Sequence, residues 1–112
     1  MDIEFSSKKL QRQLSNENAM RRHYGHVMPA LKLRLRVLDQ ADCLADVPHS
    51  RPEGRHQLFH DWDGHFAVWL TANYRLIFKP NHDPVPLLDD GGIDIGSVTS
   101  VEIVEIVDYH GK

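Results

Sequence analysis

The hydrophobic periodicity of the chain changes once, at Pro48. Before it, leucines recur at helical spacing, with Leu31, Leu35 and Leu38 at i, i+4 and i+7. After it, short runs rich in β-branched and aromatic residues alternate with turn residues, which is typical of strands. A chain of 112 residues divided in this way predicts a single α+β domain over residues 1–112.

Local signals place the expected elements. Residues 2–5 predict a first strand, residues 8–14 and 19–24 predict short helices, and residues 28–41 predict a longer helix with Pro29 in its first turn. Strands are expected at residues 56–59, 65–70, 74–78 and 98–107, with a hairpin turn at residues 61–64 and a long loop at residues 81–97. The expected fold is therefore an N-terminal strand and two to three helices packed on a mainly antiparallel sheet of four to five strands. The last run, residues 98–107, is the most β-branched and predicts a central strand buried on both faces.

The net charge of −3 conceals two halves of opposite sign. Residues 1–40 hold eight basic and four acidic residues, and residues 41–112 hold five basic and twelve acidic residues. A basic first part favours an anionic partner, although Lys and Arg that merely coat helix surfaces would give the same balance. The single cysteine, Cys43, and a polar N-terminus without a signal-peptide core favour the cytoplasm.

The expected chemistry lies in the last strands. In an extended chain Asp108 and His110 share a face, so the carboxylate could orient the imidazole for acid–base work near neutral pH. Arg75 stands in an otherwise apolar strand and could clamp a phosphate, while the Tyr109 ring could stack on a base. Together these groups suit cleavage of RNA by attack of a ribose 2′-OH on the adjacent phosphate. The alternative is structural: Arg75 pairs with Glu102 or Glu105, and the terminal Tyr-His pair covers the edge of the core.

Metal and nucleotide chemistry have little support. No Gly-rich phosphate loop, CxxC or HExxH motif is present. On a strand His56 and His60 would lie roughly 13 Å apart, too far to share an ion. No metal and no cofactor are expected.

Several stretches carry a family resemblance. They are Phe5-Ser6-Ser7-Lys8-Lys9-Leu10, Leu31-Lys32-Leu33-Arg34-Leu35, His56-Gln57-Leu58, Gly64 to Leu70, Tyr74-Arg75-Leu76-Ile77-Phe78, the loop around Gly91-Gly92, and Val101 to His110. In this order and over nearly the whole length, the chain resembles the HigB branch of the RelE/ParE superfamily, the toxins of type II toxin–antitoxin systems. The Gly-Gly loop before the last strand resembles a longer subgroup.

The resemblance implies a RelE-like fold and an endoribonuclease, an mRNA interferase that inhibits translation by cutting mRNA in the ribosomal A site without a metal. By position, His56, Arg75, Asp108, Tyr109 and His110 match the family's catalytic set. The basic helix residues Lys32, Arg34 and Arg36 would bind RNA. The implied partners are the ribosome with its mRNA and a helix-turn-helix antitoxin of the HigA type, with operator DNA reached only through the antitoxin; no membrane is involved.

The hairpin departs from the family pattern. Where family members carry a basic turn, this chain reads Asp61-Trp62-Asp63-Gly64. Carboxylates there would repel a phosphate, although His60 and His65 could supply cations when protonated and Trp62 could stack on a base. The departure leaves two further functions open: a ParE-like inhibitor of DNA gyrase without catalysis, or a degenerate toxin that only partners its antitoxin.

Overall fold

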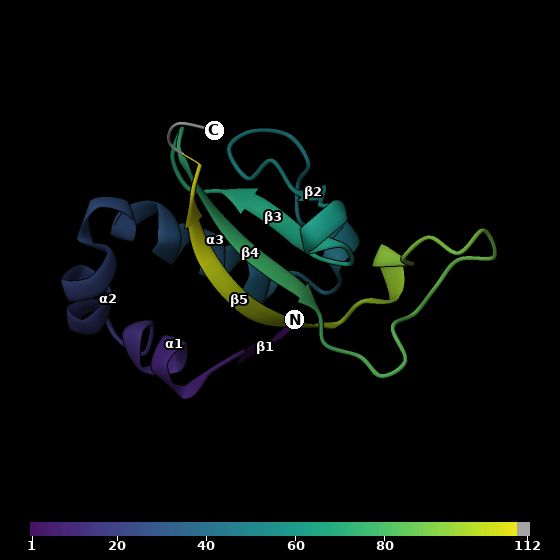
Figure 1. The fold of residues 1–112 in the computed structure, drawn as a ribbon, viewed down its shortest axis with the longest axis horizontal. Coiled ribbons are helices and arrows are strands. Elements are labelled where there is room, and N and C mark those ends of the chain that lie inside the picture. Colours follow the sequence, from purple (N-terminus) through teal and green to yellow (C-terminus); the bar gives the residue numbers. More distant parts are fainter. Residues whose placement is uncertain (110–112) are drawn as a thin grey trace.

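The computed structural model describes residues 1–109 and joins five strands in one sheet (Figure 1). The strands are β1 (Asp2–Phe5), β2 (His56–Gln57), β3 (Phe66–Trp69), β4 (Tyr74–Pro80) and β5 (Ser100–Asp108). Their order across the sheet is β1-β5-β4-β3-β2. β1 runs parallel to β5, and the remaining neighbours pair antiparallel. The predicted α+β fold with a mainly antiparallel sheet is confirmed.

Three α-helices lie between β1 and β2 in the chain: α1 (Lys8–Gln13), α2 (Glu17–Tyr24) and α3 (Met28–Gln40). Ser7 and Asn16 begin the first two, because each side-chain oxygen accepts a backbone N–H three residues further on, at 3.0 and 2.9 Å. None of the helices in the described part of the chain has the length and apolar character needed to cross a membrane.

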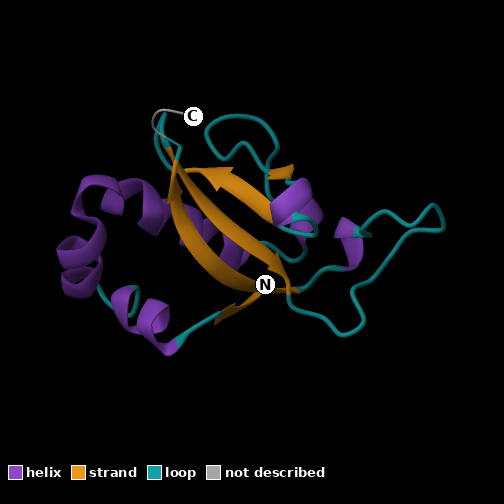
Figure 2. Cartoon of the chain, in the orientation of Figure 1, coloured by secondary structure: helices purple, strands orange, loops and turns teal. Residues whose placement is uncertain are grey.

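One face of the sheet packs on α3, which lies behind the sheet in Figure 2. Leu31 and Leu38 of α3 are fully buried in a cluster with Phe78 of β4 and Ile103 of β5. Each such side chain contributes about 1.5–3 kcal/mol by leaving water. α1 and α2 lie beyond one end of the sheet, and α3 is the α-helix drawn behind it (Figure 2).

The strand register decides which side chains lie on the face of the sheet opposite α3, here called the outer face. Phe66 and Leu76 point into the core, so their neighbours along each strand point the other way. Trp69 of β3 lies opposite Arg75 of β4, and Arg75 lies opposite Val107 of β5. Directly opposed residues share a face, and these three side chains therefore belong to the outer face.

The prediction that the last strand is buried on both faces is wrong. Val101 and Ile103 of β5 are fully buried, but Glu105 is exposed and Glu102 is only half-buried. The pairing with β4 also shifts register near Ile77, as at a β-bulge. The β-branched composition that suggested full burial instead serves a strand with neighbours on both sides and one face toward solvent.

The hairpin between β2 and β3 also differs from the expectation. β2 covers only His56–Gln57, and a 3-10 turn at His60–Trp62 replaces the tight two-residue turn. His60 adopts a positive φ of 59°, which ends the extended backbone directly after Phe59, the last residue of the predicted strand. Gly64 has the positive φ, 80°, that the Asp-Gly pair predicts.

Residues 81–97 form the predicted long loop, which extends away from the sheet at the right of Figure 1. A single bridge joins Leu87 to Ile93, and a 3-10 turn follows at Ile95–Ser97. Ile93 and Ile95 pack against the core, whereas Leu87 is 60% exposed. The loop is thus tied to the fold at its second half.

Candidate functional site

Arg75 lies on the outer face between two aromatic rings. Its guanidinium carbon is 5.6 Å from the Trp69 ring centroid and 5.4 Å from that of Tyr109. Nη1 donates hydrogen bonds to the carbonyls of Thr71 (2.9 Å), Ala72 (3.3 Å) and Tyr74 (3.0 Å). One nitrogen therefore fixes the side chain on the turn before β4, and the orientation of the remaining donors follows from it.

The structural alternative for Arg75 does not hold among residues 1–109, where no carboxylate pairs with it. Glu102 forms its ion pair with Lys79 instead, at 3.5 Å. Arg75 lies opposite the apolar Val107. Its Nε and Nη2 make no hydrogen bond within this range, so they remain able to bind an anion.

A second arginine reaches the same ring from another segment. The guanidinium carbon of Arg51, in the loop after α3, lies 5.2 Å from the Trp69 ring centroid. Arg51 is exposed, and it has no hydrogen-bond partner in the described part of the chain. Neither Arg51 nor Trp69 was assigned a role from the sequence, although Trp69 lies in the stretch Gly64 to Leu70 that carries the family resemblance.

Arg34 of α3 holds that loop against the strand. It is 8% exposed; its Nε donates to the Trp69 carbonyl (2.7 Å) and its Nη2 to the Pro52 carbonyl (3.3 Å). The Trp69 N–H in turn donates to the Glu53 carbonyl at 2.7 Å. Arg34 was expected on a solvent-facing RNA-binding surface, but the structure buries most of it as a link between helix, loop and strand.

Gly54 allows the loop to approach this closely. Its φ is +60°, and a Cβ built on it would lie 2.6 Å from Cδ2 of Trp69. Only a glycine fits both the left-handed backbone and the packing against the indole. The ring of Trp69 is therefore fixed by loop residues on one side and reached by two guanidinium groups.

These residues enclose a hollow of 460 Å³, here called the arginine hollow. It is lined by Arg34, Arg51, Pro52, Trp69, Leu70, Thr71, Ala72 and Arg75. No carboxylate is among these lining residues, and the nearby Glu53 lines a separate hollow beside α3. Three guanidinium groups without an acidic neighbour make a site with a strong preference for anions.

Asp108 lies on the other face of the sheet from Arg75. It pairs with Tyr74 across β4 and β5, and its carboxylate accepts a hydrogen bond from the Tyr74 hydroxyl. Burial, and then the charge and hydrogen bond of Asp108, raise the pKa of Tyr74. The Tyr74 ring also meets that of His26 edge-on, at 4.8 Å. Asp108 therefore belongs to a contact with the helical layer.

Of the two predicted catalytic histidines, His56 lies within the residues that the structure describes. His56 lies opposite Ala67 and so shares the outer face with Trp69, and its Nδ1 is 2.9 Å from the Gly54 carbonyl. A carbonyl only accepts, so Nδ1 carries the proton and Nε2 of the neutral ring is left as an acceptor. His110 lies outside the described residues, and its role stays a prediction.

The remaining predicted RNA contacts are spread over the molecule. Lys32 is paired with Glu17, which lowers the pKa of that carboxyl through a hydrogen bond and charge attraction. Arg36 is exposed on α3. Neither lines the arginine hollow.

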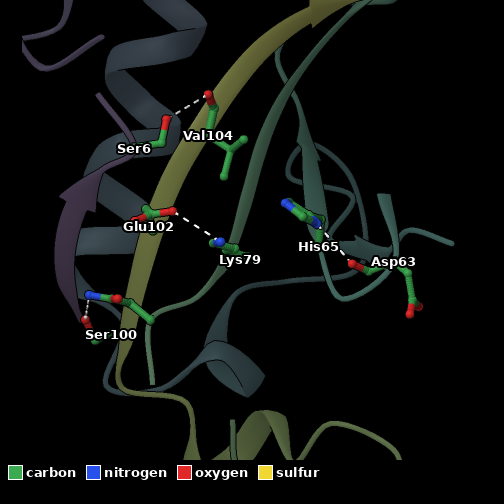
Figure 3. Close-up of polar contacts among 8 residues, drawn as sticks. Ser6, Asp63, His65, Lys79, Ser100, Glu102 and Val104 are labelled. Carbon is green, nitrogen blue, oxygen red and sulfur yellow. Dashed lines mark hydrogen bonds and ion pairs between the residues drawn. The ribbon is translucent and has the colours of Figure 1, made fainter. Parts of the chain in front are cut away.

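His60, Trp62 and His65 lie at the hairpin, away from the arginine hollow. The rings of Trp62 and His65 meet edge-on at 5.2 Å, and His65 Nδ1 is 3.1 Å from the Asp63 carbonyl (Figure 3). His65 lines a second hollow of 650 Å³ that includes Asp63, Asp83 and Glu102. With those carboxylates, this hollow suits a phosphate chain less well than the arginine hollow.

Within residues 1–109, no group of three His, Cys, Asp or Glu side chains stands close enough together to hold a metal ion.

The comparisons with known proteins concern the fold. No family model and no curated protein matches the chain at the level of sequence. A YoeB/ParE toxin from Agrobacterium tumefaciens is similar in structure, with a TM-score of 0.56 and 14% identity over 98% of this chain and 100% of the other. The crystal structure of a YafQ mutant from E. coli has a TM-score of 0.56 and 20% identity, over 96% of this chain and 91% of the other. The chain therefore shares its fold with these two proteins.

Proposed function

We propose that this protein is the toxin of a type II toxin–antitoxin system and that it cleaves mRNA on the ribosome. The observation that carries this proposal is Arg75, held on the outer face between the rings of Trp69 and Tyr109 with two nitrogens free of hydrogen bonds to the described residues. Cleavage of RNA by its own 2′-OH needs such a cation, because negative charge accumulates on the phosphorane. The toxin fold of the structural neighbours supports the same reading.

The mechanism assigns a role to each predicted catalytic residue. Arg75 binds the scissile phosphate and stabilises the phosphorane. Tyr109 stacks on the neighbouring base or shares in proton transfer. His110 and His56 act as general base and acid, and the free Nε2 of His56 suits either role. Asp108 would orient His110, and its carboxylate also accepts the hydrogen bond of Tyr74. No metal or cofactor takes part in the proposed reaction.

The proposed partners follow from the same assignment. A helix-turn-helix antitoxin of the HigA type would block the toxin and carry it to operator DNA, and the ribosome with its mRNA would be the target in the cytoplasm. Lys32 and Arg36, together with His60, Trp62 and His65 of the hairpin, would contact RNA outside the arginine hollow.

Induced expression without an antitoxin tests the proposal. We expect growth arrest and, by primer extension, discrete cuts in translated messages. Arg75→Ala and His110→Ala should relieve the arrest while circular dichroism and thermal unfolding stay those of the parent. Arg22→Ala, which removes an exposed cation on α2, is the matched control and should arrest growth like the parent. Undiminished toxicity in both Arg75→Ala and His110→Ala would refute the mechanism.

The acidic hairpin favours a second candidate. The hollow beside the hairpin holds Asp63, Asp83 and Glu102, a surface better suited to a protein than to RNA. A non-catalytic toxin of the ParE type, which inhibits gyrase by contact, would use such a surface. In the same experiment this function would give DNA damage with intact mRNA. Harmless expression would instead point to a degenerate toxin that serves only as the partner of its antitoxin.

A further inference from the structure

Resting on the proposed function, we infer that Arg51 is a second phosphate-binding residue of the RNA site and that Trp69 positions it beside Arg75. Arg51 comes from the loop after α3, more than twenty residues before Arg75 in the chain. The fold brings both guanidinium groups onto one indole ring. The ligand is the phosphodiester chain next to the cleaved bond.

The distances suit a phosphate chain. The two guanidinium carbons lie 5.2 and 5.6 Å from the same ring centroid, so they are within about 11 Å of each other. Both border the arginine hollow, whose 460 Å³ is open to solvent on the outer face. A single-stranded backbone can therefore touch both groups, either through one phosphate or through successive phosphates.

The positive charges of Arg51 and Arg75 favour binding of an anion in the arginine hollow. Guanidinium groups keep their charge at all physiological pH values, so Arg51 and Arg75 repel each other across the hollow. Among the lining residues no carboxylate offsets this repulsion. A bound phosphate would offset it and would fill the donors that remain without partners in residues 1–109, with the fork geometry that arginine offers to phosphate.

The position of Arg51 is built into the fold. Its loop is tied to Trp69 by the Glu53 carbonyl and to Arg34 by the Pro52 carbonyl. A further bond joins the Gly54 N–H to the Ser50 carbonyl, at 2.8 Å. Both neighbours of Arg51 are thus fixed, and little ordering remains to be done when a ligand binds.

The test uses the tryptophans as reporters. The chain has two, Trp62 and Trp69, so in a Trp62→Phe protein the emission comes from the hollow alone. The probe is a 2′-O-methyl oligoribonucleotide, which lacks the attacking hydroxyl and stays intact. We expect it to change the emission of Trp69 and to bind with a salt-dependent Kd, because phosphate contacts release counterions.

Arg51→Ala in this protein should weaken binding about three- to tenfold and lower the slope of log K against log salt by about 0.7, the loss of one phosphate contact on a single strand. Arg51→Lys should restore the slope and only part of the affinity, since ammonium lacks the planar fork. Trp69→Phe in the wild-type chain, read by fluorescence anisotropy of a labelled probe, should lower the slope less than Arg51→Ala does. Arg22→Ala should change neither quantity.

An unchanged slope in Arg51→Ala, with the parent's thermal unfolding, would overturn the inference and leave Arg51 as a surface contact of the indole. Binding that depends on Arg51 in a protein that cuts no mRNA would uphold the phosphate site and refute the nuclease. Cleavage of mRNA that is unchanged in Arg51→Ala would uphold the nuclease and refute the phosphate site at Arg51. The two proposals can therefore fail separately.

Discussion

Trp69 is the residue on which the arginine hollow is built. Its ring receives Arg51 and Arg75, its carbonyl accepts from Arg34, and its N–H donates to Glu53. Arg34, Arg51 and Glu53 come from segments that precede β3 in the chain, which is why periodicity and motif reasoning did not connect them with Trp69. Arg34 shows the same limit: a cation at helical spacing was assigned to solvent, but tertiary hydrogen bonds to two carbonyls offset its desolvation.

Gly54→Ala tests the close packing on Trp69. The new Cβ would clash with the indole at 2.6 Å, and the residue would be strained at φ +60°. We expect the free energy of unfolding, from urea titration, to fall by about 2–4 kcal/mol, combining strain and overpacking. Gly64→Ala is the matched control, because it has a φ of +80° with nothing within 4 Å. An equal loss in the free energy of unfolding in the two variants would show that the Trp69 ring moves aside at no cost and that its packing on Gly54 is not tight.

At the scale of elements, capping and turn chemistry predicted the helices and the strands well, because those signals are local. Ser7, Asn16 and Pro29 stand where helices begin. Burial of β5 was less predictable. Its β-branched residues look alike, but Val101 and Ile103 are fully buried whereas Glu105 is exposed. Which face of a strand is buried depends on the order of the strands in the sheet, and that order cannot be read from the local sequence of the strand.

The contact between β4 and β5 through Tyr74 predicts a pH effect. Burial and Asp108 raise the pKa of Tyr74, so folding favours its neutral hydroxyl. This contribution to stability is complete below the unfolded pKa of about 10 and is lost as pH rises through the higher folded pKa. We expect urea midpoints measured at pH 8 and 10.5 to fall less in Tyr74→Phe than in the parent. Equal falls would exclude Tyr74 as a source of alkaline sensitivity.

At the scale of the whole molecule, β5 joins the first strand to the rest of the sheet, because it lies between β1 and β4. A chain ending at residue 99 would expose the buried side chains of β1 and β4. We expect it to lose cooperative thermal unfolding, measured by circular dichroism. A chain ending at residue 108 keeps all five strands and should unfold cooperatively, while losing growth arrest with Tyr109 and His110. Cooperative unfolding of the shorter chain would show that β5 is dispensable.

The parallel pair of β1 and β5 has a consequence for the timing of synthesis. Asp2 pairs with Ser100, so β1 cannot gain its neighbour in the sheet until the chain has been synthesised as far as β5. Tyr109 reaches Arg75 only through the end of that same late strand. The contact between the Arg75 guanidinium and the Tyr109 ring therefore forms only after β5 has joined the sheet, so this side of the arginine hollow is completed late in folding.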